Sequence, residues 1–218
     1  MNPMKCQKLL QGFLKTTFED FQRSGQPPTS ASSCIGRDWV LRLSKRGIKY
    51  PGHKIKGEFM KLYCSRHGHA ENQPNTEGEH PLTALGREEV GKVAQYLGHR
   101  GVHVAHVMHS NKLRSKQTAE IFAKTLTHGP VTESCRFLNP EHPVEPLIEL
   151  IQSWHDDTFL VGHMPFISQL VSTLVVGNEH HEIVAFPPGT VVCLDRQDQH
   201  RWVLSWVLRP DLVPGENA

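Results

Sequence analysis

Three short segments place polar or charged side chains directly after an apolar run that is typical of a β-strand. They are Arg66-His67-Gly68, the stretch from Ser110 to Arg114, and Gly162-His163. In a parallel α/β sheet, the residues that follow the strands lie together at the carboxyl edge, where ligands bind. If the three strands are neighbours, two arginines and two histidines meet in one pocket.

Such a group of side chains suits a tetrahedral phosphate dianion. The guanidinium forks of Arg66 and Arg114 can hold phosphate oxygens in paired hydrogen bonds, and a neutral imidazole can attack phosphorus. Each motif alone is weak, because short motifs recur by chance, whereas their conjunction in this order at strand ends is informative. The residues therefore predict a phosphoryl-transfer site.

The elements that would position these residues alternate between short apolar strands and longer amphipathic helices from residue 60 onward. This alternation is typical of an α/β domain with a mainly parallel sheet. Thr83 can cap the first helix and Gly98 can end it. Predicted strands cover 60–64, 104–109 and 158–161, a short strand begins at 131–132, and 191–194 with 202–208 form a terminal hairpin. Predicted helices cover 84–97, 113–126, 144–154 and 165–174.

Composition excludes several classes of protein. Of the 218 residues, 38% are hydrophobic and 21% charged, as in soluble globular proteins, and no apolar run is long enough for a transmembrane helix. Five cysteines at irregular spacing, without a C-x-x-C pair, indicate neither a disulfide framework nor a cysteine zinc site. We therefore expect a reducing compartment, the cytoplasm.

Charge and pattern divide the chain in two. Residues 1–59 carry 11 Lys and Arg against 4 Asp and Glu, whereas residues 60–218 carry 13 against 18, so the main domain is not expected to bind nucleic acid. Residues 1–59 contain no core-forming unit and no secretory signal. We expect them to be an N-terminal extension that is poorly ordered or not part of the functional chain, because Met60 leads straight into a strand.

Four stretches resemble the histidine phosphatase superfamily, and within it the phosphohistidine phosphatases of the SixA type. They are LYCSRHGHAE (62–71), PLTALG (81–86), HSNKLRSKQT (109–118) and LVGHMP (160–165), and the similarity extends from residue 60 to about residue 212. The resemblance implies a phosphoglycerate-mutase-like fold, a three-layer α/β/α sandwich. It departs from the common family pattern at Asn111, at Ser115 and at His69.

The resemblance also implies roles for individual residues. His67 would be the nucleophile that becomes transiently phosphorylated, while Arg66, Arg114 and His163 bind the transferring phosphoryl group. Ser110 and Thr83 lie on the matching loops and can add hydroxyl donors, although Thr83 can equally be only a helix cap. No metal and no other cofactor is required.

The spacing of the motifs bears on the substrate. Only 17 residues separate His67 from Leu85, which leaves little room for the inserted lid that supplies a carboxylate acid in the mutase and ester-phosphatase branches. A phosphate ester expels an alkoxide and needs such an acid, whereas phosphohistidine expels an imidazole, a good leaving group near neutral pH. We therefore expect a phosphohistidine phosphatase with a shallow pocket; Glu71, His69 and Glu149 are the candidate acids if one takes part.

Partners and alternatives follow from the same reasoning. We expect a monomer whose partner is a phosphorylated protein, such as a histidine phosphotransfer domain, with neither nucleic acid nor membrane as a partner.

A small-molecule phosphate monoester phosphatase of the same superfamily is the nearest alternative, and a mutase needs a more enclosed pocket. A histidine-rich metal module would use His67 with His69, or His180 with His181, but neither pair has a metal-site spacing. A phosphate-binding protein without turnover would have little use for an intact nucleophile.

Overall fold

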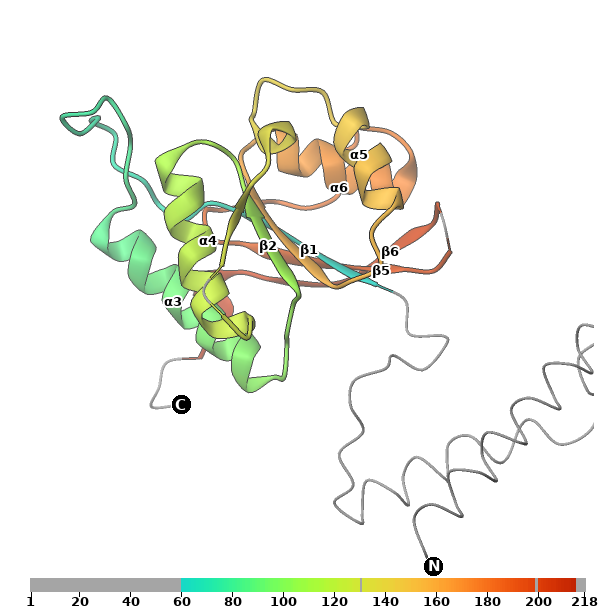
Figure 1. The fold of residues 1–218 in the computed structure, drawn as a ribbon, viewed down its shortest axis with the longest axis horizontal. Helices are drawn as coiled ribbons and strands as arrows, with labels where there is room; N and C mark the ends of the chain where they lie inside the picture. The colour runs from blue at the N-terminus through green and yellow to red at the C-terminus, as the bar shows by residue number, and fades with distance from the viewer. Residues whose placement is uncertain (1–59, 130, 199, 215–218) are drawn as a thin grey trace, which may run out of the picture. The chain divides into compact units, whose positions relative to one another are not determined.

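The computed structural model describes residues 60–129, 131–198 and 200–214, so the predicted extension 1–59 lies outside the described residues. One six-stranded sheet forms the centre of the domain, with helices on both sides (Figure 1). The strands are β1 (Lys61–Arg66), β2 (His106–His109), β3 (Glu133–Ser134), β4 (Thr158–Gly162), β5 (Val191–Arg196) and β6 (Trp202–Leu208). The helices are α3 (Ala84–His99), α4 (Leu113–Leu126), α5 (Glu145–Gln152) and α6 (Phe166–Val176), with short 3₁₀ turns at Arg136–Leu138 and Pro210–Leu212.

Strand pairing brings three strand ends to one edge of the sheet. The strand order is β3-β2-β4-β1-β5-β6, in which β3, β2, β4 and β1 are parallel and β5 and β6 form an antiparallel hairpin. Arg66 lies opposite Gly162, and His109 lies opposite Val161, so β1, β4 and β2 end level with one another. The condition on which the predicted site depends, that these three strands are neighbours, is therefore met.

Alternate residues of each central strand enter two separate cores, which makes the domain a three-layer α/β/α sandwich as predicted. Leu62 of β1 and Leu160 of β4 face α5 and α6, whereas Tyr63 and Phe159 face α3 and α4. All four are buried, as expected for strands covered on both faces. Figure 1 shows α3 and α4 on one side of the sheet and α5 and α6 on the other.

Two glycines allow α3 to pack against the loop that follows β1. A Cβ atom on Gly86 would overlap the main chain of His69, whose nitrogen lies 2.8 Å from that position. A Cβ atom on Gly68 would lie 2.7 Å from Cγ2 of Val90 in the same helix. The PLTALG and RHG segments are therefore in direct contact, and α3 fixes the loop that carries the site.

Most element boundaries differ from the prediction by one or two residues, and two of these differences have a clear structural cause. The third strand, Glu133–Ser134, begins two residues after the predicted start at 131, since its pairing with β2 and not apolar character defines it, and Val131 is 69% exposed. Helix α3 continues through Gly98, whose missing side chain accommodates Thr125 of α4, and Gly101 with φ of 76° follows its end. Of the helices in the described part of the chain, none is long and apolar enough to span a membrane.

Candidate active site

The four residues predicted to meet are brought together at the carboxyl edge of the sheet. Arg66 is the last residue of β1 and His67 follows it, His163 follows β4, and Arg114 lies in the first turn of α4. The Arg114 Nε–H group donates to Nε2 of His67 at 3.2 Å. The rings of His67 and His163 lie 5.0 Å apart between their centroids.

The hydrogen bonds of His67 determine which ring nitrogen carries the lone pair. Nδ1 lies 2.7 Å from the Gly68 carbonyl oxygen, which can only accept, so Nδ1 carries the hydrogen and Nε2 has the lone pair. Burial lowers the pKa of His67 to about 4, against the hydrogen bond to Gly68, and the positive charges of Arg114 and Arg66 lower it further. His67 is therefore neutral near pH 7, with a nucleophilic Nε2 next to Arg114.

His163 belongs to a buried network that connects the ends of β2 and β4. Its Nε2 lies 2.5 Å from the Ser110 hydroxyl oxygen, which also accepts the Lys112 N–H at 3.3 Å. The hydroxyl hydrogen then has the Nε2 lone pair as its acceptor, which leaves the ring hydrogen on Nδ1. His163 is only 2% exposed, and burial, with the neighbouring His67 and Arg114, lowers its pKa to about 3.

The main chain around β5 positions Arg66. Its Nη1 donates to the Phe186 carbonyl oxygen at 2.8 Å, and its backbone N–H donates to the Thr190 carbonyl oxygen at 3.2 Å. Burial lowers the pKa of Arg66, yet a guanidinium stays charged at any physiological pH. The Nε atom of Arg66 is buried and has no hydrogen-bond partner within the described residues, and the same is true of Nδ1 of His163.

Two hydroxyl residues of α4, which the sequence analysis did not assign to the site, hold its loops. The Thr118 hydroxyl accepts the Gly68 N–H at 3.1 Å and donates to the Arg114 carbonyl at 2.8 Å. The Ser115 hydroxyl accepts the Ser110 N–H at 3.2 Å and donates to the Val161 carbonyl at 2.8 Å. The one sequence feature that could have pointed to Thr118 and Ser115 is their position inside the HSNKLRSKQT stretch.

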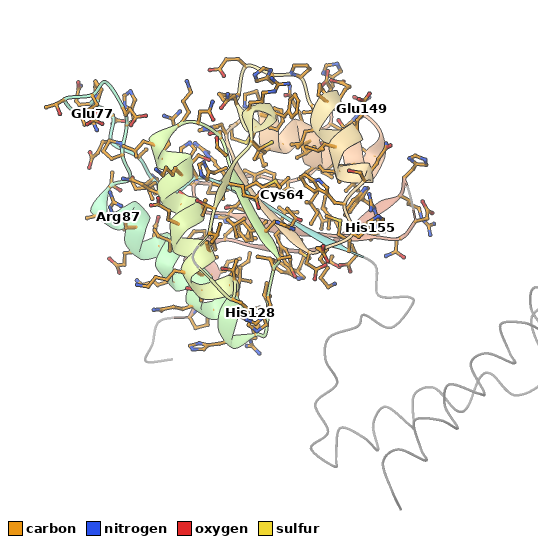
Figure 2. The ribbon with its side chains drawn as sticks, in the orientation of Figure 1. Cys64, Glu77, Arg87, His128, Glu149 and His155 are labelled. Atoms are coloured by element: carbon orange, nitrogen blue, oxygen red, sulfur yellow. The ribbon has the colours of Figure 1, made fainter. Side chains whose placement is uncertain are left out.

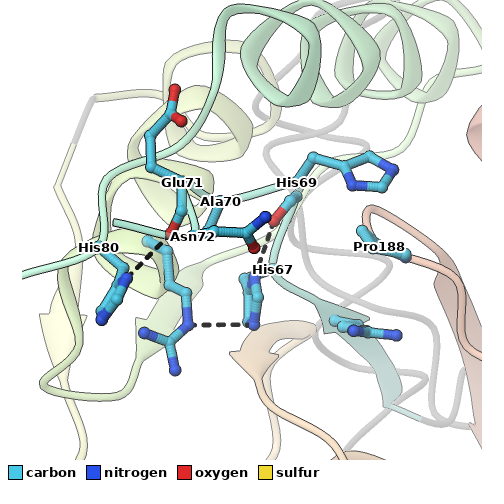
Figure 3. A pocket seen from close by; sticks show the side chains of 10 residues that line it. His67, His69, Ala70, Glu71, Asn72, His80 and Pro188 are labelled. Carbon is cyan, nitrogen blue, oxygen red and sulfur yellow. Dashed lines mark hydrogen bonds between the residues drawn. The ribbon is translucent and has the colours of Figure 1, made fainter. Parts of the chain in front are cut away.

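An open pocket of about 500 Å³ lies above His67 (Figure 3). His69 and His80 lie on opposite sides of the His67 ring, and the Glu71 carboxylate points away from that ring. His80, which the sequence did not predict for the site, also lines the pocket, and its Nδ1–H donates to the Glu71 carbonyl at 2.9 Å. The pocket is lined by Arg66, His67, Gly68, His69, Ala70, Glu71, Asn72, His80, Arg114 and Pro188.

Three further residues considered for the site do not line the pocket. The Thr83 hydroxyl accepts the Gly86 N–H at 2.9 Å as the cap of α3 and does not line the pocket, so the capping alternative is the one that the structure supports. Ser110 is fully buried and, like His163, to which its hydroxyl is bonded, is not among the residues that line the pocket. Glu149 is an exposed residue of α5, remote from the pocket (Figure 2). Within the described residues, no three His, Cys, Asp or Glu side chains are grouped to hold a metal ion.

Comparison with known proteins agrees with this geometry. The family model of the histidine phosphatase superfamily (branch 1) matches residues 62–137, which include Arg66, His67 and Arg114. An uncharacterized protein of Picosynechococcus is 30% identical over 130 residues, 57% of this chain and 78% of that protein. The chain belongs to the histidine phosphatase superfamily.

Within this superfamily, the chain is similar to SixA. The phosphohistidine phosphatase SixA of Escherichia coli is 26% identical over 155 residues, which cover 69% of this chain and 94% of SixA. A solved structure of the protein histidine phosphatase SixA complexed with tungstate superposes with a TM-score of 0.64 at 22% identity. That superposition covers 70% of this chain and 98% of the other. The predicted phosphoglycerate-mutase-like fold of the superfamily is thereby confirmed.

Proposed function

We propose that the protein is a phosphatase that removes phosphate from a phosphorylated histidine on a protein surface, through a covalent intermediate on His67. One observation carries the proposal. The Nε2 lone pair of the neutral His67 ring accepts the Arg114 Nε–H in an open pocket, where Glu71, the one acidic residue of the lining, directs its carboxylate away. Membership of the superfamily and similarity to SixA support the phosphatase activity in general.

The reaction consists of two displacements at phosphorus. In the first, the Arg114 Nε–H passes from Nε2 of His67 to a phosphoryl oxygen, and Nε2 forms a bond to phosphorus while the bond to the substrate imidazole breaks. That imidazole takes a proton from water as it leaves, and the hydroxide so formed is neutralised by the proton that the attacking water loses in the second step. In the second, water attacks the phosphohistidine of the enzyme, which releases inorganic phosphate and restores neutral His67. Each step transfers one phosphoryl group, and neither changes an oxidation state.

Fixed cations and free donors make the pocket suitable for the charge of the phosphoryl group. Arg66 and Arg114 supply guanidinium groups, which bind phosphate oxygens in pairs. The Nε–H of Arg66 and the Nδ1–H of His163 have no partner within the described residues, so no protein acceptor competes with a phosphoryl oxygen for them. A site whose donors are positioned before the substrate arrives loses little free energy to reorganisation.

The leaving group distinguishes phosphohistidine from an ester. An alkoxide leaving group requires a general acid, but the Glu71 carboxylate points away from His67 and Glu149 is remote. His69 lines the pocket and lies 3.8 Å from Glu89, so it is the remaining candidate acid of the three. An imidazole leaves without strong assistance, and the open pocket can admit a side chain displayed on another protein.

Partner and location are part of the same proposal. A phosphorylated histidine exposed on a helical phosphotransfer domain would reach the pocket without an insertion being displaced, with this chain acting as a monomer. The cysteines support a reducing compartment, the cytoplasm, because Cys64, Cys135 and Cys193 are free thiols and two of them are buried.

The test compares two substrates and two variants without added metal. The wild-type protein, His67→Ala and His155→Ala are incubated with a histidine-phosphorylated protein and with a serine phosphate ester, and phosphate release is followed. His155 is a matched control because it is an exposed histidine far from the pocket. We expect release from phosphohistidine only, which His67→Ala abolishes and His155→Ala retains. Release mainly from the ester would favour the small-molecule phosphatase, and release from neither would overturn the proposal.

A further inference from the structure

His80 lines the same pocket as Arg66, His67 and Arg114, although it belongs to none of the four segments that predicted the site. It lies at the end of the loop 71–80, across the His67 ring from His69 (Figure 3). A role for His80 rests on the proposed function, because it concerns the phosphate that the pocket would hold.

The main chain holds His80 firmly at the rim of the pocket. The two ends of its loop are joined by a β-bridge between Ala70 and Leu82 and by a hydrogen bond from the Glu71 N–H to the Pro81 carbonyl at 2.8 Å. The Leu82 N–H in turn donates to Oε1 of Gln117 in α4 at 2.8 Å. The loop base is therefore fixed to the helix that carries Arg114.

The ring of His80 has one nitrogen engaged and one nitrogen available. Nδ1 donates its hydrogen to the Glu71 carbonyl, so Nε2 carries the lone pair in the neutral ring and becomes a second donor when the ring is protonated. No hydrogen bond or ion pair to Nε2 is formed within the described residues, and the Glu71 carboxylate points away from the pocket. The charged and titratable groups that share the pocket with His80 are Arg66, Arg114, His67, His69 and Glu71.

We propose that His80 is a further phosphate-binding residue, whose protonated ring donates from Nε2 to an oxygen of the phosphoryl group held between Arg66 and Arg114. A protonated ring that shares the pocket with two guanidinium groups attracts a dianion bound there. Unlike an arginine, a histidine supplies the charge only below or near neutral pH. His80 should therefore strengthen phosphate binding at pH 6, where its ring can be protonated, and should not do so at pH 8.

The test uses inorganic phosphate, which has no leaving group, as the ligand. Dissociation constants are measured for wild type, His80→Gln, His80→Arg and the control His155→Gln at pH 6 and pH 8. A charge-assisted hydrogen bond of typical strength predicts that His80→Gln binds phosphate about tenfold more weakly than wild type at pH 6. At pH 8 the two should be nearly equal, and His80→Arg should bind tightly at both. Comparing variants at one pH cancels the ionisation of phosphate itself.

Each other outcome would overturn the inference. Equal phosphate affinity of His80→Gln and wild type at pH 6 would exclude His80 as a ligand, and slower hydrolysis at equal affinity would make it a leaving-group contact. An equal loss at both pH values would exclude the protonated form. Hydrolysis of phosphohistidine by wild type, measured in parallel, separates this failure from that of the proposed function. A thermal unfolding curve shows whether each variant is folded.

Discussion

Replacing Thr118 with valine removes one hydroxyl group from a fully buried position and keeps the shape of the side chain. The hydroxyl is the acceptor for the Gly68 N–H at 3.1 Å, and its loss leaves that donor buried without a partner. An unpaired buried donor costs about 1–3 kcal/mol, so we expect the free energy of unfolding to fall by about 2 kcal/mol.

The same substitution should reduce activity, because the Gly68 carbonyl orients the His67 ring through its bond to Nδ1. A small displacement of a reacting atom lowers the rate steeply, and we expect kcat to fall about tenfold or more with a smaller change in KM. Thr118→Ser keeps the hydroxyl and is the matched control, which should retain kcat.

Urea unfolding measures the stability change, and single-turnover hydrolysis of a histidine-phosphorylated protein measures the rate. If the valine variant is as stable and as active as wild type, Thr118 does not position the loop. If serine fails as badly as valine, the methyl group rather than the hydrogen bond maintains the site.

The remaining predictions concern packing, cations, pH and the acid. Gly86→Ala should lower the urea midpoint by the equivalent of about 3 kcal/mol, because the added methyl group meets main chain that cannot easily move. Arg114→Lys should lower kcat/KM by about 10²-fold with little change in thermal stability, since lysine has no guanidinium fork and no Nε–H. Burial lowers the pKa of His67 and of His163 to about 4 and about 3, so the unfolded chain binds more protons below pH 6.5. The free energy of unfolding should thus be highest above pH 6.5 and decrease as the pH falls toward 3. The decrease should be roughly 3 kcal/mol for His67 alone, and a series of urea midpoints measures it. Glu149→Gln should hydrolyse phosphohistidine at the wild-type rate, and a large loss would mean that this carboxylate reaches the site after all.

The sequence predicted the position of the cationic and nucleophilic residues because strand pairing places them. Apolar stretches identify β1, β2 and β4, and a parallel register brings whatever follows each strand to one edge. Arg66, His67 and His163 need no further information than this. Arg114 follows because the helix after β2 begins only four residues beyond the strand, at Leu113.

Residues that act through packing between elements were not predictable in the same way. Whether Thr83 faces the pocket or caps α3 depends on the helix start, and its hydroxyl bonds the Gly86 N–H. His80 reaches the pocket only because the ends of its loop are joined through Ala70 and Leu82, a pairing that no periodicity signals. The tautomer of His67 depends on where the Gly68 carbonyl oxygen lies, which the sequence does not show.

The first turns of α4 explain how an open pocket keeps its geometry without an inserted lid. Arg114 bonds the His67 ring, Ser115 bonds the ends of β2 and β4, Gln117 bonds Leu82 and Thr118 bonds Gly68. Helix geometry fixes these four side chains relative to one another, so one helix holds the segments that follow β1 and β2, the end of β4 and the base of the loop 71–80. Lys116 is the one residue of 114–118 without such a bond to the site, and it is exposed because it lies on the face of α4 directed away from the site. Order is thus supplied by the helix, and the pocket beside it stays open.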